Sequence, residues 1–339
     1  MKIAYFSAEP WEKEYVAKRL PKNDVLFYDG HVNANPEVSE PDAEALSVFV
    51  DSKIGEPQLA RFPKLKWVAT RSTGFDHIDL AACAKRGIGV ANVPSYGENT
   101  VAEFAFALIL ALSRRIIEAH DLISRTGTFT QEHLRGFDLA GKTLGVVGCG
   151  HIGVNAIRIG NGFGMKVLGF DVRQDAALAQ KLGFSYAGLD ELLASSDIIT
   201  LHVPYNAHTR HLLNRDNMKK IKRGATLINT SRGGIVETEA LIGALKDGTI
   251  SCAGLDVLEE EGEMSETEEL ALLTAKHPNE SALKAVLADR YLIDHPCVIV
   301  TPHIAFDTDE AVKRIVDTTL ENLKAFIAGT PVNLVKLND

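Results

Sequence analysis

A glycine pattern in the middle of the chain has the form of a phosphate-binding turn. The stretch TLGVVGCGHIGV begins as an apolar strand at Thr143, and its glycines then open a predicted helix, His151–Phe163. Glycines in the pattern G-x-G-x-x-G permit a tight turn, the close approach of a pyrophosphate, and close packing of helix on strand. The amides and positive dipole at the start of the helix would hold the phosphates. The residues predicted to bind them are Gly148, Gly150, His151, Ile152 and Gly153.

An acidic residue follows the next predicted strand, Lys166–Phe170. The carboxylate of Asp171 would accept hydrogen bonds from the hydroxyls of an adenosine ribose and would repel a 2′-phosphate. Strand, helix and acidic partner together favour a site for NAD over a glycine turn that serves packing alone. Arg173 and Arg158 lie nearby in the sequence, and a guanidinium tolerates a 2′-phosphate. The pattern therefore does not exclude NADP as the cofactor.

Two later stretches place charged groups directly after predicted strands. Arg232 in NTSRGG follows the strand Thr226–Asn229, and its planar set of donors suits a carboxylate or a polarised carbonyl. His303 in TPHIAF follows the strand Val298–Thr301, and a histidine gives or takes a proton near neutral pH. Ligands of open parallel sheets bind outside the carboxyl ends of the strands, which makes both residues candidates. A single loop arginine or histidine is nevertheless more often structural.

Short β-rich runs alternate with amphipathic segments along almost the whole chain, which predicts an α/β fold. The remaining predicted strands are Lys2–Ser7, Val25–Tyr28, Leu46–Val50, Lys66–Thr70, Gly89–Val93, Thr143–Val147, Ile198–Val203 and Cys252–Val257. One long helix is expected from Thr100 to about Arg125, and an amphipathic helix, Thr308–Ala328, is expected to fold back onto the first domain. We therefore expect two Rossmann-like domains, each a doubly wound parallel sheet, with the active site in the cleft between them.

The composition limits the classes of partner. A chain of 339 residues, 45% of them hydrophobic, can bury the cores of two domains. The net charge of −9 argues against a general surface for nucleic acid or anionic membranes. No apolar run is long enough to span a bilayer, and we expect a cytoplasmic protein. The cysteines show no paired spacing and are expected to be buried free thiols: Cys83, Cys149, Cys252 and Cys297.

The order of these motifs resembles that of the D-2-hydroxyacid dehydrogenases over nearly the whole chain. The matching stretches are the glycine pattern with Asp171, then His202-Val-Pro204, Asn229-Thr-Ser-Arg-Gly233, Gly254-Leu-Asp-Val257 with Glu261, and Thr301-Pro-His303. The resemblance implies an NAD-dependent oxidoreductase with a substrate-binding arginine, an acid/base histidine and a glutamate paired with it. By position, these catalytic residues are Arg232, His303 and Glu261. The resemblance also implies cofactor contacts for His202, Val203, Pro204, Thr230 and Asp256, the last at the nicotinamide carboxamide.

Two stretches, NVPSYGENTVAEF and HIAFDTDEAV, are similar to the D-lactate dehydrogenase branch of that family. They imply that Tyr96 and Phe306 line the substrate pocket, while the family as a whole uses the backbone at Thr73 and Gly74 to bind the substrate carboxylate. The expected substrate is then pyruvate, reduced to D-lactate. Hydroxypyruvate, glyoxylate and branched 2-keto acids are alternatives, because pocket volume decides the choice. A formate dehydrogenase is disfavoured, because it would carry glutamine in place of Glu261.

The resemblance further implies a domain arrangement and an assembly. Residues 1–98 and 303–339 would form a discontinuous substrate domain, and residues 99–302 the NAD-binding domain. The long helix from Thr100 suits a homodimer contact through the NAD-binding domain. A protein of another class, an NADH-sensing corepressor that binds peptides, uses the same fold and is a second reading of the chain.

Other polar features of the sequence are expected to lie on the surface. His208 and His211 could share one face of a helix, but no third metal ligand stands near them, and no metal is expected. An acidic stretch offers Glu259, Glu260 and Glu263 as alternatives to Glu261. The segment that follows, Glu263–Tyr291, is longer than is usual for the family and would be a lid, an interface element or an insertion.

Overall fold

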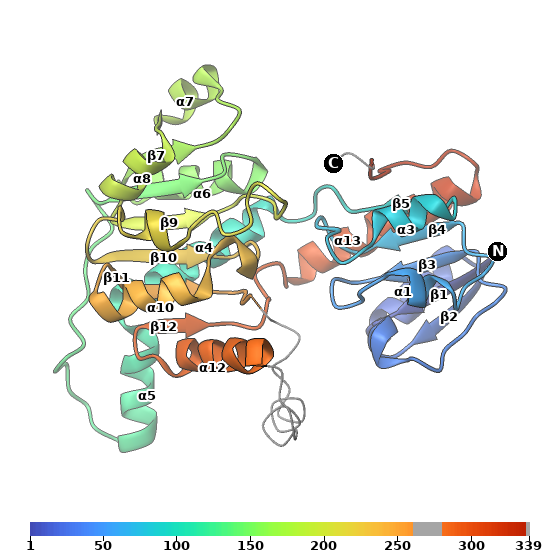
Figure 1. Cartoon of the computed structure of the whole chain (residues 1–339), viewed down its shortest axis with the longest axis horizontal. Coiled ribbons are helices and arrows are strands. Elements are labelled where there is room, and N and C mark those ends of the chain that lie inside the picture. The colour runs from blue at the N-terminus through green and yellow to red at the C-terminus, as the bar shows by residue number, and fades with distance from the viewer. Residues whose placement is uncertain (260–279, 337–339) are drawn as a thin grey trace. The chain divides into compact units, whose positions relative to one another are not determined.

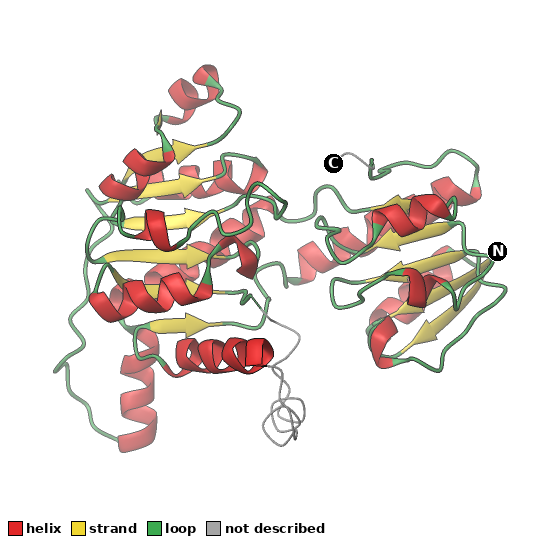
Figure 2. Cartoon of the chain, viewed as in Figure 1, coloured by secondary structure: helices red, strands yellow, loops and turns green. Residues whose placement is uncertain are grey.

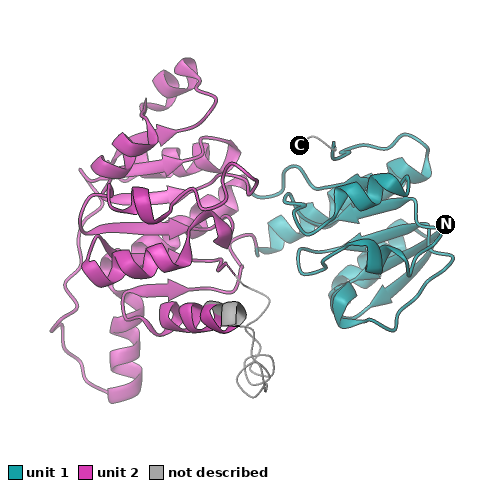
Figure 3. Cartoon of the chain, in the orientation of Figure 1, with its two compact units in different colours: residues 1–97, 307–339 teal, residues 98–306 magenta. Residues whose placement is uncertain are grey.

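The computed structural model describes residues 1–259 and 280–336 and divides the chain into two compact units (Figure 1). The first unit comprises residues 1–97 and 307–339, and the second comprises residues 98–306 (Figure 3). The chain thus crosses between units after residue 97 and after residue 306, where the sequence suggested 98 and 302. His303 and Phe306 consequently belong to the second unit.

The first unit is a parallel sheet of five strands in the order β2-β1-β3-β4-β5. This order is that of flavodoxin-like doubly wound sheets. Its strands are β1 (Lys2–Phe6), β2 (Asp24–Tyr28), β3 (Ala45–Val48), β4 (Trp67–Thr70) and β5 (Gly89–Ala91). Its helices are α1 (Pro10–Arg19), α2 (Glu56–Leu59), α3 (Leu80–Lys85) and α13 (Asp309–Ile327), with a 3-10 turn η1 (Val32–Ala34).

The second unit is a parallel sheet of seven strands in the order β12-β11-β10-β9-β6-β7-β8. The first strand of the unit, β6, lies between β7 and β9, so the direction of winding reverses there, as in dinucleotide-binding folds. The strands are β6 (Thr143–Val147), β7 (Lys166–Phe170), β8 (Ser185–Tyr186), β9 (Ile198–Leu201), β10 (Ala225–Asn229), β11 (Ile250–Leu255) and β12 (Val298–Val300). The helices are α4 (Glu98–Arg114), α5 (Ile116–Thr126), α6 (His151–Gly162), α7 (Ala176–Leu182), α8 (Leu189–Ser195), α9 (Arg215–Met218), α10 (Thr238–Asp247) and α12 (Glu280–Asp294), with a 3-10 turn η2 (Gly233–Ile235).

Apolar side chains fill both faces of each sheet, as the continuous apolar strands require. In β10, Leu227 packs into one core and its neighbour Ile228 into the other, which also contains the apolar face of α4. In β1, Phe6 and Tyr5 divide in the same way between the two cores of the first unit. The predicted two Rossmann-like domains are therefore confirmed.

The helix α13 packs on the first sheet, although it lies at the far end of the chain. Val316, Leu320 and Leu323 are buried against the side chains of Tyr5 and Trp67. The side chain of Thr308 caps the helix by accepting a hydrogen bond from the amide of Ala311. The amphipathic pattern of the segment thus leads to burial of its apolar face.

Two sequence expectations need correction, and one strand was not predicted. The long helix from Thr100 breaks into α4 and α5 at Arg115, which adopts a left-handed conformation with φ 49°. The strand β8 was not predicted, because two residues are too few to show an alternation of apolar and polar side chains. Cys252 and Cys297 are half-buried, whereas Cys83 and Cys149 are buried as expected.

No helix in the described ranges is long and apolar enough to cross a membrane.

Candidate active site

The predicted site residues that the structure describes in the second unit follow the carboxyl ends of its strands. Figure 2 shows these strands as yellow arrows. Because the strands are parallel, these ends meet at one edge of the sheet. The residues at that edge are Gly148 after β6, Asp171 after β7, His202 after β9, Arg232 after β10, Asp256 after β11 and His303 after β12. The fold therefore brings residues far apart in sequence to the same side of the second unit.

The glycine turn between β6 and α6 has no room for side chains at two of its three glycines. Gly148 has φ 96°, and a Cβ there would lie 2.6 Å from the carbonyl oxygen of His202. A Cβ on Gly153 would lie 1.9 Å from the carbonyl oxygen of Gly148. A Cβ on Gly150 would meet no atom within 4 Å. Gly150 is the N-cap of α6, and no side chain caps this helix. The turn thus leaves the amides at the start of α6 open to an anion.

The carboxylate of Asp171 is fixed beside this turn. One oxygen accepts a hydrogen bond from the amide of Cys149 at 2.8 Å, and the other accepts one from the amide of Arg173 at 2.8 Å. Each carboxylate oxygen retains a further lone pair for a ligand hydroxyl. The position fits the predicted contact with an adenosine ribose.

The stretch His202-Val-Pro204 closes the other side of the glycine turn. The amide of His202 donates to the carbonyl of Val147 at 2.7 Å, and its Nε2 lies 3.0 Å from the hydroxyl of Thr200. Burial lowers the pKa of the His202 imidazole to about 4. The ring is therefore neutral at physiological pH.

Two buried polar atoms at this edge have no hydrogen-bond partner among the described residues. They are Nδ1 of His202 and the hydroxyl oxygen of Thr230. A buried polar atom without a partner costs free energy, and such atoms are often satisfied by a bound group. Both residues are predicted cofactor contacts, and the open space at Gly150 adjoins the same turn. The residues present therefore fit NAD.

Arg232 begins a tightly packed turn, η2, after β10. The hydroxyl of Ser231 donates to the carbonyl of Leu201 at 2.6 Å, and the side chain of Asn229 donates to the carbonyl of Arg232 at 2.9 Å. A Cβ on Gly233 would lie 1.9 Å from the carbonyl oxygen of Leu258, which explains why glycine follows the arginine. The half-buried Arg232 thus stands on a backbone held by its neighbours, and its Nη1 donates to the carbonyl of Ser231 at 2.8 Å.

Side chains of His211, Thr238 and Glu259 form hydrogen bonds next to the turn η2. Nε2 of His211 lies 2.6 Å from Oε1 of Glu259, and the hydroxyl of Thr238 donates to Oε2 of Glu259 at 2.8 Å. The amide of His211 donates to the carbonyl of Gly234 at 2.8 Å. Burial acts to raise the pKa of the Glu259 carboxyl, but the hydrogen bonds from His211 and Thr238 outweigh it and hold the pKa below its ordinary value. We call His211, Thr238 and Glu259 the loop clamp.

Asp256 organises the loop that carries His303. Its carboxylate, 1% exposed, accepts hydrogen bonds from the Thr301 hydroxyl at 2.6 Å and from the amides of Ile304 at 3.0 Å and Ala305 at 2.8 Å. Its backbone carbonyl accepts the amide of His303 at 2.9 Å. Burial raises the pKa of Asp256 against these hydrogen bonds, which lower it. The contacts are those of a strand-end cap, and a role at the nicotinamide carboxamide stays a prediction.

His303 has a backbone conformation that is uncommon for a side chain of its size. Its φ is 54°, in the left-handed region, and the loop held by Asp256 maintains it. The ring of Phe306 meets the imidazole edge to face, with the ring centroids 6.5 Å apart. The predicted acid/base and one predicted pocket residue therefore lie together. The predicted partner of His303, Glu261, lies outside the described residues.

The predicted substrate turn of the first unit is held by side chains behind it. The hydroxyl of Thr73 donates to the carbonyl of Val93 at 2.7 Å, and Asn92 donates to the carbonyl of Thr73 at 2.8 Å. The hydroxyl of Ser72 donates to the carbonyl of Gly74 at 2.6 Å. The turn is thus fixed within its own unit. Tyr96, the other predicted residue of this unit, is half-buried.

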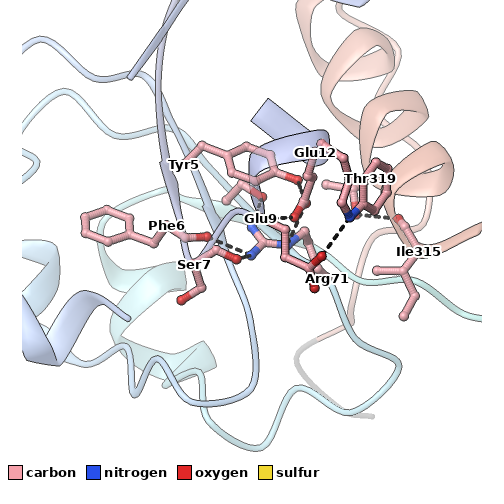
Figure 4. A network of polar contacts seen from close by, with 10 residues as sticks. Tyr5, Phe6, Ser7, Glu9, Glu12, Arg71, Ile315 and Thr319 are labelled. Atoms are coloured by element: carbon pink, nitrogen blue, oxygen red, sulfur yellow. Dashed lines mark hydrogen bonds and ion pairs between the residues drawn. The ribbon is translucent and has the colours of Figure 1, made fainter. Parts of the chain in front are cut away.

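A buried charged network lies directly before this turn (Figure 4). The guanidinium of Arg71, 3% exposed, donates to the carbonyls of Phe6 at 2.7 Å and Ser7 at 2.9 Å. Its Nε lies 3.4 Å from the carboxylate of Glu12, which also accepts the hydroxyl of Tyr5. Each charged group is therefore paired, as burial demands. The network links β1, α1 and the end of β4.

Comparison with known proteins agrees with this architecture. Residues 106–305 match the family described as D-isomer specific 2-hydroxyacid dehydrogenase, NAD binding domain. The chain belongs to this family. It is 38% identical over 334 residues to 2-hydroxyacid dehydrogenase A of Aspergillus oryzae, covering 96% of this chain and 92% of the relative. It is 35% identical over 343 residues to glyoxylate reductase of Thermococcus litoralis, covering 95% and 96%.

A solved structure extends the likeness to three dimensions. The D-lactate dehydrogenase of Aquifex aeolicus, in complex with NAD and lactic acid, has a TM-score of 0.85 and 37% identity, covering 97% of this chain and 96% of that one. The predictions of a D-2-hydroxyacid dehydrogenase, of an oxidoreductase and of NAD as cofactor are confirmed. The roles of single residues stay predictions.

The structure of this D-2-hydroxyacid dehydrogenase also shows polar residues that the sequence did not single out for a role. Glu12, Arg71, Asn92 and Thr238 each make contacts across long stretches of chain, which no local pattern signals. Of the two histidines considered as metal ligands, His211 pairs with Glu259. Within residues 1–259 and 280–336, no three histidine, cysteine or acidic side chains cluster in a way that could hold a metal ion. His208 is exposed.

Proposed function

We propose that this enzyme reduces pyruvate to D-lactate. The observation that carries the proposal is the common edge at which Arg232 and His303 follow β10 and β12, beside the glycine turn after β6. An arginine suits the carboxylate of a keto acid, and a histidine suits proton transfer to its carbonyl oxygen. The similarity to a D-lactate dehydrogenase whose structure contains lactic acid favours pyruvate among the keto acids.

In this proposal, Arg232 binds the substrate carboxylate and stabilises the negative charge that develops on the carbonyl oxygen. Protonated His303 donates its proton to that oxygen. NADH, when bound, supplies the hydride for C2 of the substrate. Asp256 holds His303 in place through the loop that both share.

We propose Glu261 as the hydrogen-bond partner of the His303 imidazole, which it would orient toward the substrate. Of the alternatives, Glu259 uses both carboxylate oxygens in the loop clamp. Phe306 lies against His303 and is proposed to line the substrate pocket. Thr73, Gly74 and Tyr96 of the first unit are proposed to bind substrate. We also propose a homodimer that associates through the NAD-binding domain.

A keto-acid panel tests the choice of substrate. NADH oxidation is followed with pyruvate, hydroxypyruvate, glyoxylate, phenylpyruvate and 2-ketoisocaproate, and the alcohol formed is tested for handedness. We expect the highest kcat/KM with pyruvate and a D-alcohol product. A higher value for glyoxylate would assign the chain to the activity of its Thermococcus litoralis relative and contradict the proposal.

A second assay separates the enzyme from an NADH-sensing corepressor. NADH affinity is measured by fluorescence quenching beside turnover, and peptide binding is measured with and without NADH. Tight NADH binding with no turnover of any keto acid, together with NADH-dependent peptide binding, would favour the corepressor. Turnover without peptide binding would exclude it.

A further inference from the structure

Two of the four cysteines lie next to each other on neighbouring strands. Cys252 is in β11, and Cys297 directly precedes β12. Both are half-buried, whereas Cys83 and Cys149 are buried. The pair lies toward the amino ends of these strands, and Asp256 and Thr301 follow their carboxyl ends. The cysteines are therefore remote in the sheet from the proposed catalytic edge.

The register of the two strands places the cysteines opposite one another. Ala253 pairs with Val298 in parallel register, and the amide of Ala253 donates to the carbonyl of Cys297 at 3.0 Å. Extending this register by one residue pairs Cys252 with Cys297. Paired residues of parallel strands point to the same face, and the strands lie about 4.8 Å apart. That spacing lies within the range of roughly 4.4 to 6.8 Å between Cα atoms of disulfide-bonded cysteines.

The thiol of Cys297 also acts on the pKa of the Cys252 thiol. Burial raises the pKa of the Cys252 thiol to about 12, and a hydrogen bond to Cys297 contributes in the same direction. Cys252 is thus a neutral thiol at physiological pH, beside Cys297 on the neighbouring strand. Such a thiol does not begin an exchange reaction but can complete one.

We propose that Cys252 and Cys297 form a reversible disulfide when the protein meets a small disulfide compound. Cys297 loses its proton to solvent, and its thiolate attacks one sulfur of that compound, which releases one small thiolate. Cys252 then gives up its proton and attacks the sulfur of Cys297, which forms the bond between the strands and releases a second small thiol. Two protein thiols are oxidised, and one small disulfide is reduced to two thiols.

The test uses the folded full-length chain and oxidised glutathione as the probe. After incubation and quenching with acid, the intact mass and the peptides are measured by mass spectrometry. We expect the wild-type protein to lose two hydrogens and to give a peptide pair linked through Cys252 and Cys297. Dithiothreitol should restore the starting mass. Absence of that peptide pair, or a linkage to Cys83 or Cys149, overturns the proposal.

Four variants distinguish the cysteine that attacks the small disulfide from the cysteine that completes the bond. Cys252→Ser should keep a stable glutathione adduct on Cys297, because no thiol remains to displace it, and Cys297→Ser should remain unmodified. The matched controls Cys83→Ser and Cys149→Ser should form the linkage as the wild type does. A linkage that forms in urea but not in the folded protein would also overturn the proposal. None of these readouts depends on which keto acid the enzyme reduces.

Discussion

The imidazole of His303 is the single group on which the proposed proton transfer depends. Replacing it with glutamine removes the acid/base while the loop contacts of the backbone to Asp256 persist. We expect His303→Gln to lower kcat by a factor on the order of 100 or more. NADH binding, measured by fluorescence titration, should remain within about twofold of the wild type, because the glycine turn is untouched.

His208→Gln is the matched control for that substitution, because His208 is exposed and lies outside the proposed site. The control should retain wild-type kcat and KM. Equal kcat values for His303→Gln and His208→Gln would remove His303 from the mechanism. Loss of NADH binding in His303→Gln would instead indicate damage to the fold of the second unit.

The His202 imidazole makes stability depend on pH. Burial lowers its pKa from 6.5 to about 4, so below pH 6.5 the unfolded chain binds a proton that the folded chain does not. Stability is therefore full above pH 6.5 and falls as the pH drops toward 4. One pKa unit corresponds to about 1.4 kcal/mol, and for a half-buried ring we expect a loss of about 2 kcal/mol.

Urea unfolding at pH 7 and pH 5 measures this dependence. The drop in the free energy of unfolding between the two pH values should be smaller in His202→Gln than in the wild type. His208→Gln, at an exposed position, should show the wild-type drop. An unchanged drop in His202→Gln would mean that other groups cause the acid sensitivity.

Among the elements, the turn η2 carries the proposed substrate arginine, and the loop clamp supports it. Glu259→Ala would leave His211 and Thr238 without the carboxylate that joins them. We expect the turn to loosen and the KM for the keto acid to rise several-fold, with NADH affinity unchanged. Steady-state kinetics with a parallel NADH titration provides the measurement.

The exposed ion pair of Glu239 with Arg215 supplies the control. Glu239 lies on α10, the helix that begins with Thr238 of the loop clamp. The side chains of Arg215 and Glu239 are 65% and 66% exposed. Such pairs contribute little, so Glu239→Ala should leave the KM unchanged. The role of the clamp would be refuted by equal KM values in Glu259→Ala and Glu239→Ala.

The sequence predicted the sheets better than the contacts between loops. Apolar strands of parallel sheets are continuous runs, and β6 and β7 begin and end at the predicted residues. Residues at strand ends could be placed at one edge because parallel topology alone determines that edge. The pairing of His211 with Glu259 depends on how two distant loops fold, and no periodicity encodes it. The break at Arg115 was missed because neither glycine nor proline marks it.

At the scale of the whole molecule, α5 is a helix of the described ranges that leaves several apolar side chains exposed. None of its residues is buried, and Ile116, Ile117 and Ile123 are 54%, 43% and 45% exposed. Phe129, just beyond the helix, is 93% exposed. Ile116 and Ile123 are seven residues apart and share one face of the helix. Apolar residues gathered in this way on a surface element are typical of a protein interface.

A second copy of the chain is the occupant that the proposed homodimer requires. A charge on the shared face of α5 would have to be buried without a partner, so we expect Ile123→Glu to convert the dimer to a monomer. Light scattering coupled to gel filtration measures the mass. Leu287→Glu, at a 58% exposed leucine on α12 in the same unit, should remain dimeric. A wild-type protein that is monomeric at micromolar concentration would contradict the dimer, and a dimeric Ile123→Glu would move the interface away from α5.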